Sequence, residues 1–292
     1  MVLFGGVLYG MMSSFVKLSY AKGYNAAELS FYQALLAALF LGTCALCSRK
    51  KQKAALSGQK LLPLILAGSA IGLTNFLYYL SVQYIAASLA IVILMQFTWF
   101  CLLIEWLCFG KKPSGQEIGT VFMVWSGTVM AGNLLSGAAT SFSWKGFLFA
   151  ALSSLTYALY IVANSRTGKN MAWPVKSTLI MVGSALTIFC INFRTIIWDN
   201  HFSPDFFGRI AFLAILGTTL PTALFAVGIP KIGVGISAIL MTIELPTAVL
   251  CAHLILSEDI TFVQMSGLLV MVSSISWMNF RKSRLKALKQ LD

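Results

Sequence analysis

Apolar stretches of about 20 residues follow one another along nearly the whole chain, with short polar gaps between them. A helix of that length crosses the roughly 30 Å hydrocarbon core of a bilayer. Because lipid offers no hydrogen-bond partners, only helices and closed barrels can cross it, and the alternating pattern of barrel strands is absent. The sequence therefore predicts an all-α integral membrane protein. Its ten transmembrane helices are expected at residues 1–20, 26–48, 61–82, 86–109, 117–136, 144–164, 175–197, 207–229, 233–256 and 262–280.

The composition agrees with lipid as the main solvent. Of the 292 residues, 58% are hydrophobic and 10% are charged, whereas soluble domains carry about 25% charged residues. A net charge of +12 could suit nucleic acid. The basic residues lie in the gaps between apolar stretches, however, so we expect contact with membrane lipid and no nucleic-acid partner.

The positions of the lysines and arginines predict the orientation of the chain. Sixteen of the 21 fall in alternate gaps and after the last span, including the cluster at 49–53 and the tail from Arg281. The positive-inside rule places those segments in the cytoplasm. Both termini are then cytoplasmic, which requires an even number of spans. We expect a multi-pass protein of the plasma membrane, the inner membrane in a bacterial cell.

The two halves of the chain resemble each other. Residues 93–95 and 239–241 are both Ile-Leu-Met, and Ser13-Ser14 aligns with Ser153-Ser154 in the same order along each half. We predict a duplication, with repeats at 1–138 and 139–280 and a basic cytoplasmic tail at 281–292. Since five spans is an odd number, the two repeats would be inverted, as in many secondary transporters, with the substrate site near the midplane between them.

Two segments carry a resemblance to a known family. The segment NFLYYLSVQYIAASLAIVILMQFTW from Asn75 and the segment IPKIGVGISAILMTIELPTAVLCAHLILSEDI from Ile229 are similar to the signatures of the drug/metabolite transporter superfamily, in particular its EamA-type members. Lys17 and Arg166 match frequent basic positions of that family. Gln33 departs from it, because many members have an arginine there.

The resemblance implies an exporter or facilitator of amino acids, related metabolites or drug-like compounds. It also implies a central cavity lined by helices 1, 3, 4, 6, 8 and 9. Alternating access, with protons as a candidate coupling ion, is the expected mechanism, and nucleotide-sugar-like exchange is an alternative.

Glu244 falls in the middle of an apolar span. A charge there costs about 2.5–3.5 kcal/mol on insertion scales, so such residues usually face a cavity or a partner. We interpret Glu244 as a protonatable or amine-binding carboxylate, although a hydrogen-bonded structural role near Pro246 is also open. Pro246 removes a helical hydrogen bond and is a gating candidate, with a simple bend as the alternative.

Further candidates for substrate binding come from spans 3, 4, 6 and 9. Gln96 and Trp99 share a helix face, and Thr242 stands opposite Gln96 in the repeat. These side chains could contact substrate or join helices. Aromatic and amide groups deep in their spans could also hold an amphipathic solute, with an interfacial belt as the alternative. They are Asn75, Tyr78 and Tyr157.

Three other ionisable residues are ambiguous. Lys17 is a candidate for gating or for an ionic contact, but its side chain could instead reach the outer surface. Glu105 and His253 lie close to interfaces, where solvation explains them without a function.

The sequence disfavours other classes of function. It contains no phosphate-binding glycine loop, so ATP hydrolysis is not expected to drive transport. The spans contain no paired histidines or aspartates, which makes an intramembrane enzyme the less favoured alternative. We expect a small-molecule substrate, no cofactor and no metal. The oligomeric state does not follow from the sequence.

Overall fold

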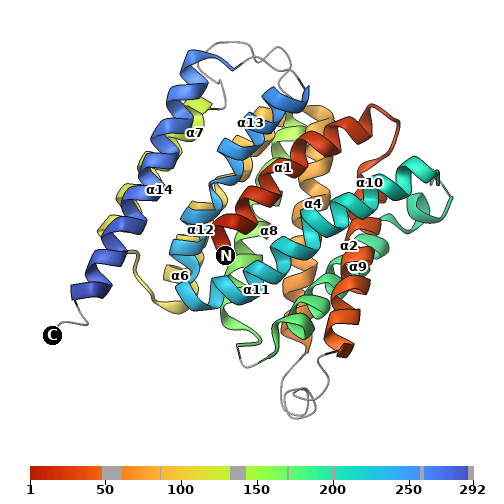
Figure 1. Ribbon diagram of the computed structural model, residues 1–292, viewed down its shortest axis with the longest axis horizontal. Helices are drawn as coiled ribbons and strands as arrows, with labels where there is room; N and C mark the ends of the chain where they lie inside the picture. The colour runs from red at the N-terminus through yellow and green to blue at the C-terminus, as the bar shows by residue number, and fades with distance from the viewer. Residues whose placement is uncertain are drawn as a thin grey trace.

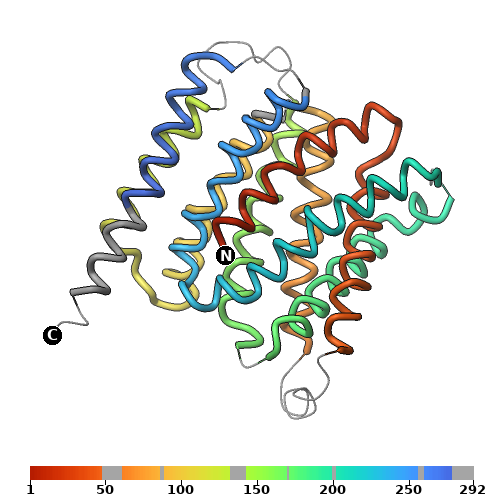
Figure 2. Tube along the Cα trace, in the orientation of Figure 1, coloured from red at the N-terminus to blue at the C-terminus, as the bar shows by residue number. Residues whose placement is uncertain are grey.

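The computed structural model describes residues 1–47, 61–85, 87–131, 143–169, 171–198, 202–256 and 260–288, and Figure 1 draws the remainder as a thin grey trace. Figure 2 follows the path of the chain in the same orientation. All regular secondary structure within these ranges is helical. The basic cluster expected at 49–53 and the last residues of the predicted tail, 289–292, lie outside the described residues.

The first half of the chain forms α1 Val2–Tyr20, α2 Ala26–Cys47, α4 Leu62–Tyr84, α5 Ala87–Leu94, α6 Phe97–Phe109 and α7 Gly115–Ala131. The second half forms α8 Trp144–Arg166, α9 Trp173–Trp198, α10 Pro204–Ala214, the π-helical turn η3 Ile215–Thr219, α11 Leu220–Ile232, α12 Val234–Met241, α13 Glu244–Leu256 and α14 Phe262–Leu288.

The predicted membrane fold is confirmed. Eight helical segments of the described chain are long and apolar enough to cross a bilayer, and they coincide with eight of the expected spans. The other two expected spans contain the 17-residue helix α7 and the apolar stretch Phe262–Trp277 of α14. The total of ten spans therefore stays a prediction. Helix α14 continues to Leu288, so it includes the first part of the expected tail.

The helices form a bundle with two distinct edges (Figure 1). Helices α7 and α14 pack side by side at one edge, and α2, α9 and α10 lie at the opposite edge. Between them stand α1, α4, α8 and the helices from α11 to α13. The central helices are therefore the ones that can enclose a site.

Close helix crossings occur at glycines. A Cβ atom on Gly72 of α4 would lie 2.9 Å from the Cα atom of Ser184 of α9. A Cβ on Gly127 of α7 would lie 2.8 Å from the carbonyl oxygen of Gly267 of α14. Small residues let backbones approach in this way, and van der Waals packing then stabilises helix pairs in lipid.

The contacts between the two halves come in corresponding pairs. Helix α4 packs on α8 and α1 packs on α11, while α6 packs on α8 and α1 packs on α13. Helix α2 packs on α9, and α7 packs on α14. The helices of the two halves can be matched in chain order: α1 with α8, α2 with α9, α4 with α10–α11, α5–α6 with α12–α13, and α7 with α14. When each helix is replaced by its match, every contact named above becomes itself or another contact of the same set.

Two expected spans are interrupted close to the same sequence, Ile-Leu-Met. Helix α5 ends at Leu94 and α6 begins at Phe97, so the break falls at residues 95–96. Helix α12 ends at Met241 and α13 begins at Glu244, so the second break falls at residues 242–243. Each break comes at or just after an Ile-Leu-Met sequence. Hydrogen bonds between residues three apart cross both breaks, including Gln96 N–H to the Ile93 carbonyl at 3.1 Å and Ile243 N–H to the Leu240 carbonyl at 3.4 Å. Each break is therefore a tighter turn within the span.

Candidate functional site

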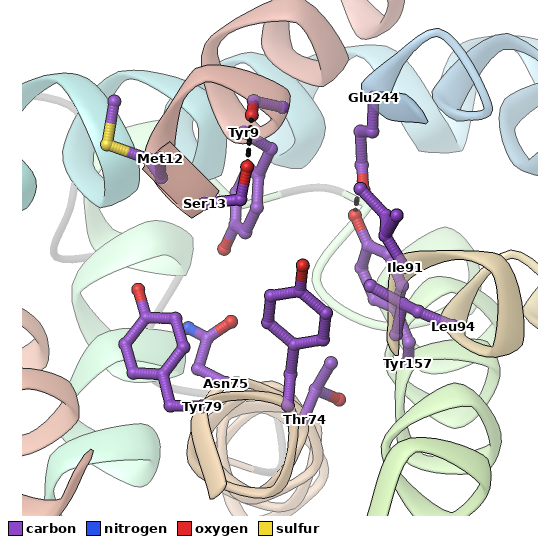
Figure 3. A pocket seen from close by; sticks show the side chains of 12 residues that line it. Tyr9, Met12, Ser13, Thr74, Asn75, Tyr79, Ile91, Leu94, Tyr157 and Glu244 are labelled. Atoms are coloured by element: carbon purple, nitrogen blue, oxygen red, sulfur yellow. Dashed lines mark hydrogen bonds between the residues drawn. The ribbon is translucent and has the colours of Figure 1, made fainter. Parts of the chain in front are cut away.

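A cavity lies among α1, α4, α5, α8 and α13, and the space in it together with the solvent at its opening amounts to about 450 Å³. Figure 3 shows Tyr9 from α1 on one side, Asn75 and Tyr79 from α4 across from it, and Glu244 meeting Tyr157 beside them. The complete lining is Tyr9, Gly10, Met12, Ser13, Thr74, Asn75, Tyr78, Tyr79, Ile91, Leu94, Tyr157 and Glu244. Both halves of the chain contribute to it.

The break between α12 and α13 positions Glu244. It is the first residue of α13, where the helix dipole favours a carboxylate. Gly10 of α1 fixes the depth of this helix start, because a Cβ atom on Gly10 would meet the carbonyl oxygen of Glu244 and lie 2.8 Å from Cβ of Thr247. The close crossing of α1 and α13 thus brings the carboxyl group into the cavity.

Glu244 has a hydrogen bond but no basic partner. The Tyr157 hydroxyl donates to its Oε1 at 2.6 Å, and the residue is 3% exposed. Among the described residues, no lysine, arginine or histidine forms an ion pair with it. An ionised carboxylate in this position carries a large desolvation cost that one neutral hydrogen bond offsets only in part. A proton or a bound cation would offset the remainder.

Tyrosine rings make up much of the cavity wall. The Tyr157 ring packs against Phe97 with centroids 4.7 Å apart, and its centroid lies 6.4 Å from that of Tyr9. The Tyr79 hydroxyl donates to Oε1 of Gln33 at 3.1 Å. The Tyr78 hydroxyl, in contrast, is buried and has no hydrogen-bond partner within the described part of the chain. Burying such a group costs free energy unless a ligand or water satisfies it.

The structure brings four of the predicted substrate-binding residues together in this cavity, namely Asn75, Tyr78, Tyr157 and Glu244. The other three do not line it. The Gln96 amide donates to the Val92 carbonyl at 3.3 Å. Trp99 packs edge-on against Phe122 of α7, with ring centroids 5.2 Å apart. The Thr242 hydroxyl is buried and donates to the Ile239 carbonyl at 2.7 Å.

The remaining coupling and gating candidates are separate from the cavity lining. Lys17 is exposed near the end of α1. Pro246 is buried in the first turn of α13. A proline in the first turn breaks no helical hydrogen bond, because those N–H groups have no partner within the helix. The interruption of this span therefore lies before Pro246.

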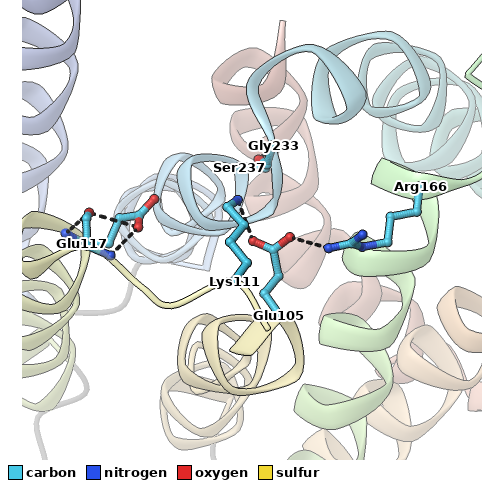
Figure 4. Close-up of polar contacts among 7 residues, drawn as sticks. Glu105, Lys111, Glu117, Arg166, Gly233 and Ser237 are labelled. Carbon is cyan, nitrogen blue, oxygen red and sulfur yellow. Dashed lines mark hydrogen bonds and ion pairs between the residues drawn. The ribbon is translucent and has the colours of Figure 1, made fainter. Parts of the chain in front are cut away.

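A second polar cluster joins the end of α6 to the end of α8 (Figure 4). Glu105 pairs with Arg166 at 3.1 Å and with Lys111 at 2.9 Å, and its side chain is only 7% exposed. The Arg166 guanidinium also lies 3.4 Å from the centre of the Phe109 ring. This ionic cluster connects the two halves of the chain. The sequence explained Glu105 by solvation near an interface, whereas the structure shows it buried between two basic partners.

The comparisons with known proteins agree with this architecture. The model of the EamA-like transporter family matches residues 1–132 and again 144–280. The chain belongs to the EamA-like transporter family. Among curated proteins, it is 27% identical over 234 residues to an uncharacterized transporter of Synechocystis sp. (strain ATCC 27184 / PCC 6803 / Kazusa), covering 75% of this chain and 68% of that one. A crystal structure of a protein at 15% identity superposes with a TM-score of 0.73 over 97% of both chains, which supports the fold.

Within this EamA-like fold, sequence reasoning missed several lining residues. Tyr9, Met12 and Ser13 come from α1, a helix whose apolar pattern gives no indication of which face is inward. Gly10 was a detectable signal, because a glycine inside a span often marks a close approach of helices. Thr74 and Tyr79 are neighbours of Asn75 and Tyr78, the two residues of α4 that the sequence predicted for substrate binding. Helix α4 lines the cavity with more than one face, so its adjacent residues also reach the cavity.

Proposed function

We propose that this EamA-like protein is a secondary transporter that exports or facilitates amino acids or related amine-bearing metabolites by alternating access. The observation that carries this proposal is the cavity between the two halves. It encloses one buried carboxyl group, that of Glu244, which is surrounded by tyrosines and has no basic partner in the described part of the chain. A substrate ammonium group would supply the missing positive charge, and the tyrosine rings would contact the apolar part of the solute.

The same carboxyl group supports a role for protons in coupling. A proton and a substrate ammonium each neutralise Glu244, so both would compete for one group. Exchange of the two across the membrane would follow if the cavity opens to each side in turn. We include proton coupling in the proposal on this ground.

We further propose that the repeats at 1–138 and 139–280 are inverted and rock against each other. Three observations support this arrangement: the paired helix contacts, the two helix breaks at Ile-Leu-Met, and the family model that matches each half separately. Inverted repeats in secondary transporters place the substrate site at their interface, near discontinuous helices.

One alternative substrate class has specific support. The tyrosine-lined wall also suits planar, drug-like amines, so efflux of such compounds is the second candidate. Nucleotide-sugar-like exchange has less support, because a phosphate needs basic or N–H donors and the described lining contains no lysine or arginine.

Flux measurements in proteoliposomes test the proposal. Labelled amino acids, biogenic amines, nucleotide sugars and cationic drugs would be loaded, with and without a pH gradient. We expect flux of at least one amine-bearing class, and we expect Glu244→Gln to abolish the response to the pH gradient. Absence of flux for every class would contradict transport. A Glu244→Gln variant that retained gradient-dependent flux would exclude this residue from coupling.

A further inference from the structure

We infer that the cavity selects organic cations that lack a carboxylate over zwitterionic amino acids of the same size. The preferred ligand is an ammonium compound with an aromatic or apolar body. This inference rests on the proposed transport function, which names amino acids and related amine-bearing metabolites. Within that class it favours the solutes with a net positive charge over the zwitterionic amino acids.

The charges of the lining carry the first step. Glu244 is the one acidic residue of the described lining, and neither lysine, arginine nor histidine belongs to it. In an α-amino acid the carboxylate carbon is only two bonds from the ammonium nitrogen. An ammonium group placed against Glu244 would therefore hold its own carboxylate close to a second negative charge, in a site of low dielectric constant where repulsion is strong.

The neutral donors of the lining do not compensate for that repulsion. The Thr74 hydroxyl is shared with Thr156 at 2.9 Å, and the Ser13 hydroxyl donates to the Gly10 carbonyl at 3.1 Å. The Tyr157 hydroxyl already donates to Glu244. The donors that remain are the unpartnered Tyr78 hydroxyl, the Asn75 amide and the Tyr9 hydroxyl. All three are neutral, and none supplies the positive charge that normally balances a buried carboxylate.

The aromatic residues of the lining supply the second step. Tyr9, Tyr78, Tyr79 and Tyr157 come from three helices and surround one space. The faces of tyrosine rings attract cations within about 6 Å of the ring centre, and more strongly where water is excluded. Rings combined with one carboxylate suit a quaternary or primary ammonium group. The same rings give an anion no comparable attraction.

Equilibrium binding to the purified full-length protein in detergent tests the inference. Three probes share a phenylethyl group and differ in their charged groups: 2-phenylethylammonium, phenylalanine and 3-phenylpropanoate. We expect the cation to bind at least about tenfold more tightly than the zwitterion, and the anion to bind least. Glu244→Gln should weaken binding of the cation by at least about tenfold, because it removes a buried charge partner, and should change the affinity for the zwitterion by no more than about twofold.

Glu117→Gln is the matched control, since it makes the same chemical change outside the cavity lining and should leave all three affinities unchanged. Equal binding of cation and zwitterion, no binding of the cation, or a cation preference that survives Glu244→Gln would each overturn the inference. Flux of the three probes in proteoliposomes separates this result from the function. Transport of the zwitterion as fast as the cation would contradict the inference and leave the transporter proposal intact. Tight binding of the cation without flux of any probe would contradict the transporter proposal and leave the inference intact.

Discussion

Tyr78 and Tyr79 are neighbours on α4, yet their hydroxyl groups have different surroundings. The Tyr79 hydroxyl donates to Gln33, a side chain that is 2% exposed, while the Tyr78 hydroxyl has no partner among the described residues. Removing a bonded hydroxyl leaves the buried acceptor unsatisfied, but removing an unbonded one relieves a desolvation cost. The two residues therefore separate stability from binding.

We predict that Tyr78→Phe keeps or slightly raises the melting temperature and weakens binding of an ammonium ligand severalfold. Tyr79→Phe, as the matched control, should lower the free energy of unfolding by about 1–3 kcal/mol. Thermal unfolding in detergent and equilibrium binding measure the two effects. Equal destabilisation by both variants, or unchanged affinity in Tyr78→Phe, would show that Tyr78 is structural.

At this scale the sequence predicted part of the site. Asn75, Tyr78, Tyr157 and Glu244 could be selected because polar groups deep in apolar spans need a partner or a cavity. Gln96 fell outside this set because its amide satisfies a carbonyl of its own helix turn. Hydropathy cannot distinguish a side chain that hydrogen-bonds locally from one that faces a cavity, so the distinction required the fold.

Among the secondary-structure elements, the crossing of α1 and α13 is the one that sets the geometry of the site. Gly10 allows the start of α13 to approach so closely that a Cβ atom there would meet the Glu244 backbone. Any side chain at this position must displace one helix from the other. The position of the carboxyl group therefore depends on the absence of a single methyl group.

We predict that Gly10→Ala lowers the free energy of unfolding by about 1–3 kcal/mol and impairs ligand binding, because overpacking forces backbone shifts. Gly115→Ala is the matched control, since a Cβ atom there meets nothing within 4 Å. Unfolding and binding would be measured on both variants. Wild-type affinity in Gly10→Ala would show that the depth of α13 does not control the site.

Hydropathy predicted the helical elements better than their interruptions. Long apolar runs identified the spans, but the break at Met95–Gln96 has neither proline nor glycine to announce it. Pro246 indicated a disturbance in the equivalent span, yet the break precedes it at Thr242–Ile243. These breaks leave little trace in composition, because local hydrogen bonds between residues three apart cross them and require neither glycine nor proline.

For the whole molecule, the prediction open to the most direct test is the even number of spans. We expect reporter tags fused to the two termini to lie on the same, cytoplasmic, side of the membrane, because the lysines and arginines concentrate in alternate gaps. Fluorescent-protein and alkaline-phosphatase fusions at each end measure this in whole cells. Tags on opposite sides would exclude ten spans and the inverted arrangement of the repeats.

The two interrupted spans also affect how the molecule could deform. A continuous helix transmits a tilt from one end to the other, because bending it sharply sacrifices main-chain hydrogen bonds. At residues 95–96 and 242–243 the regular helix is already interrupted. We expect α5 and α12 to reorient with little change in the direction of α6 and α13. One rim of the bundle could then widen while the opposite rim keeps its width, as a hinge allows.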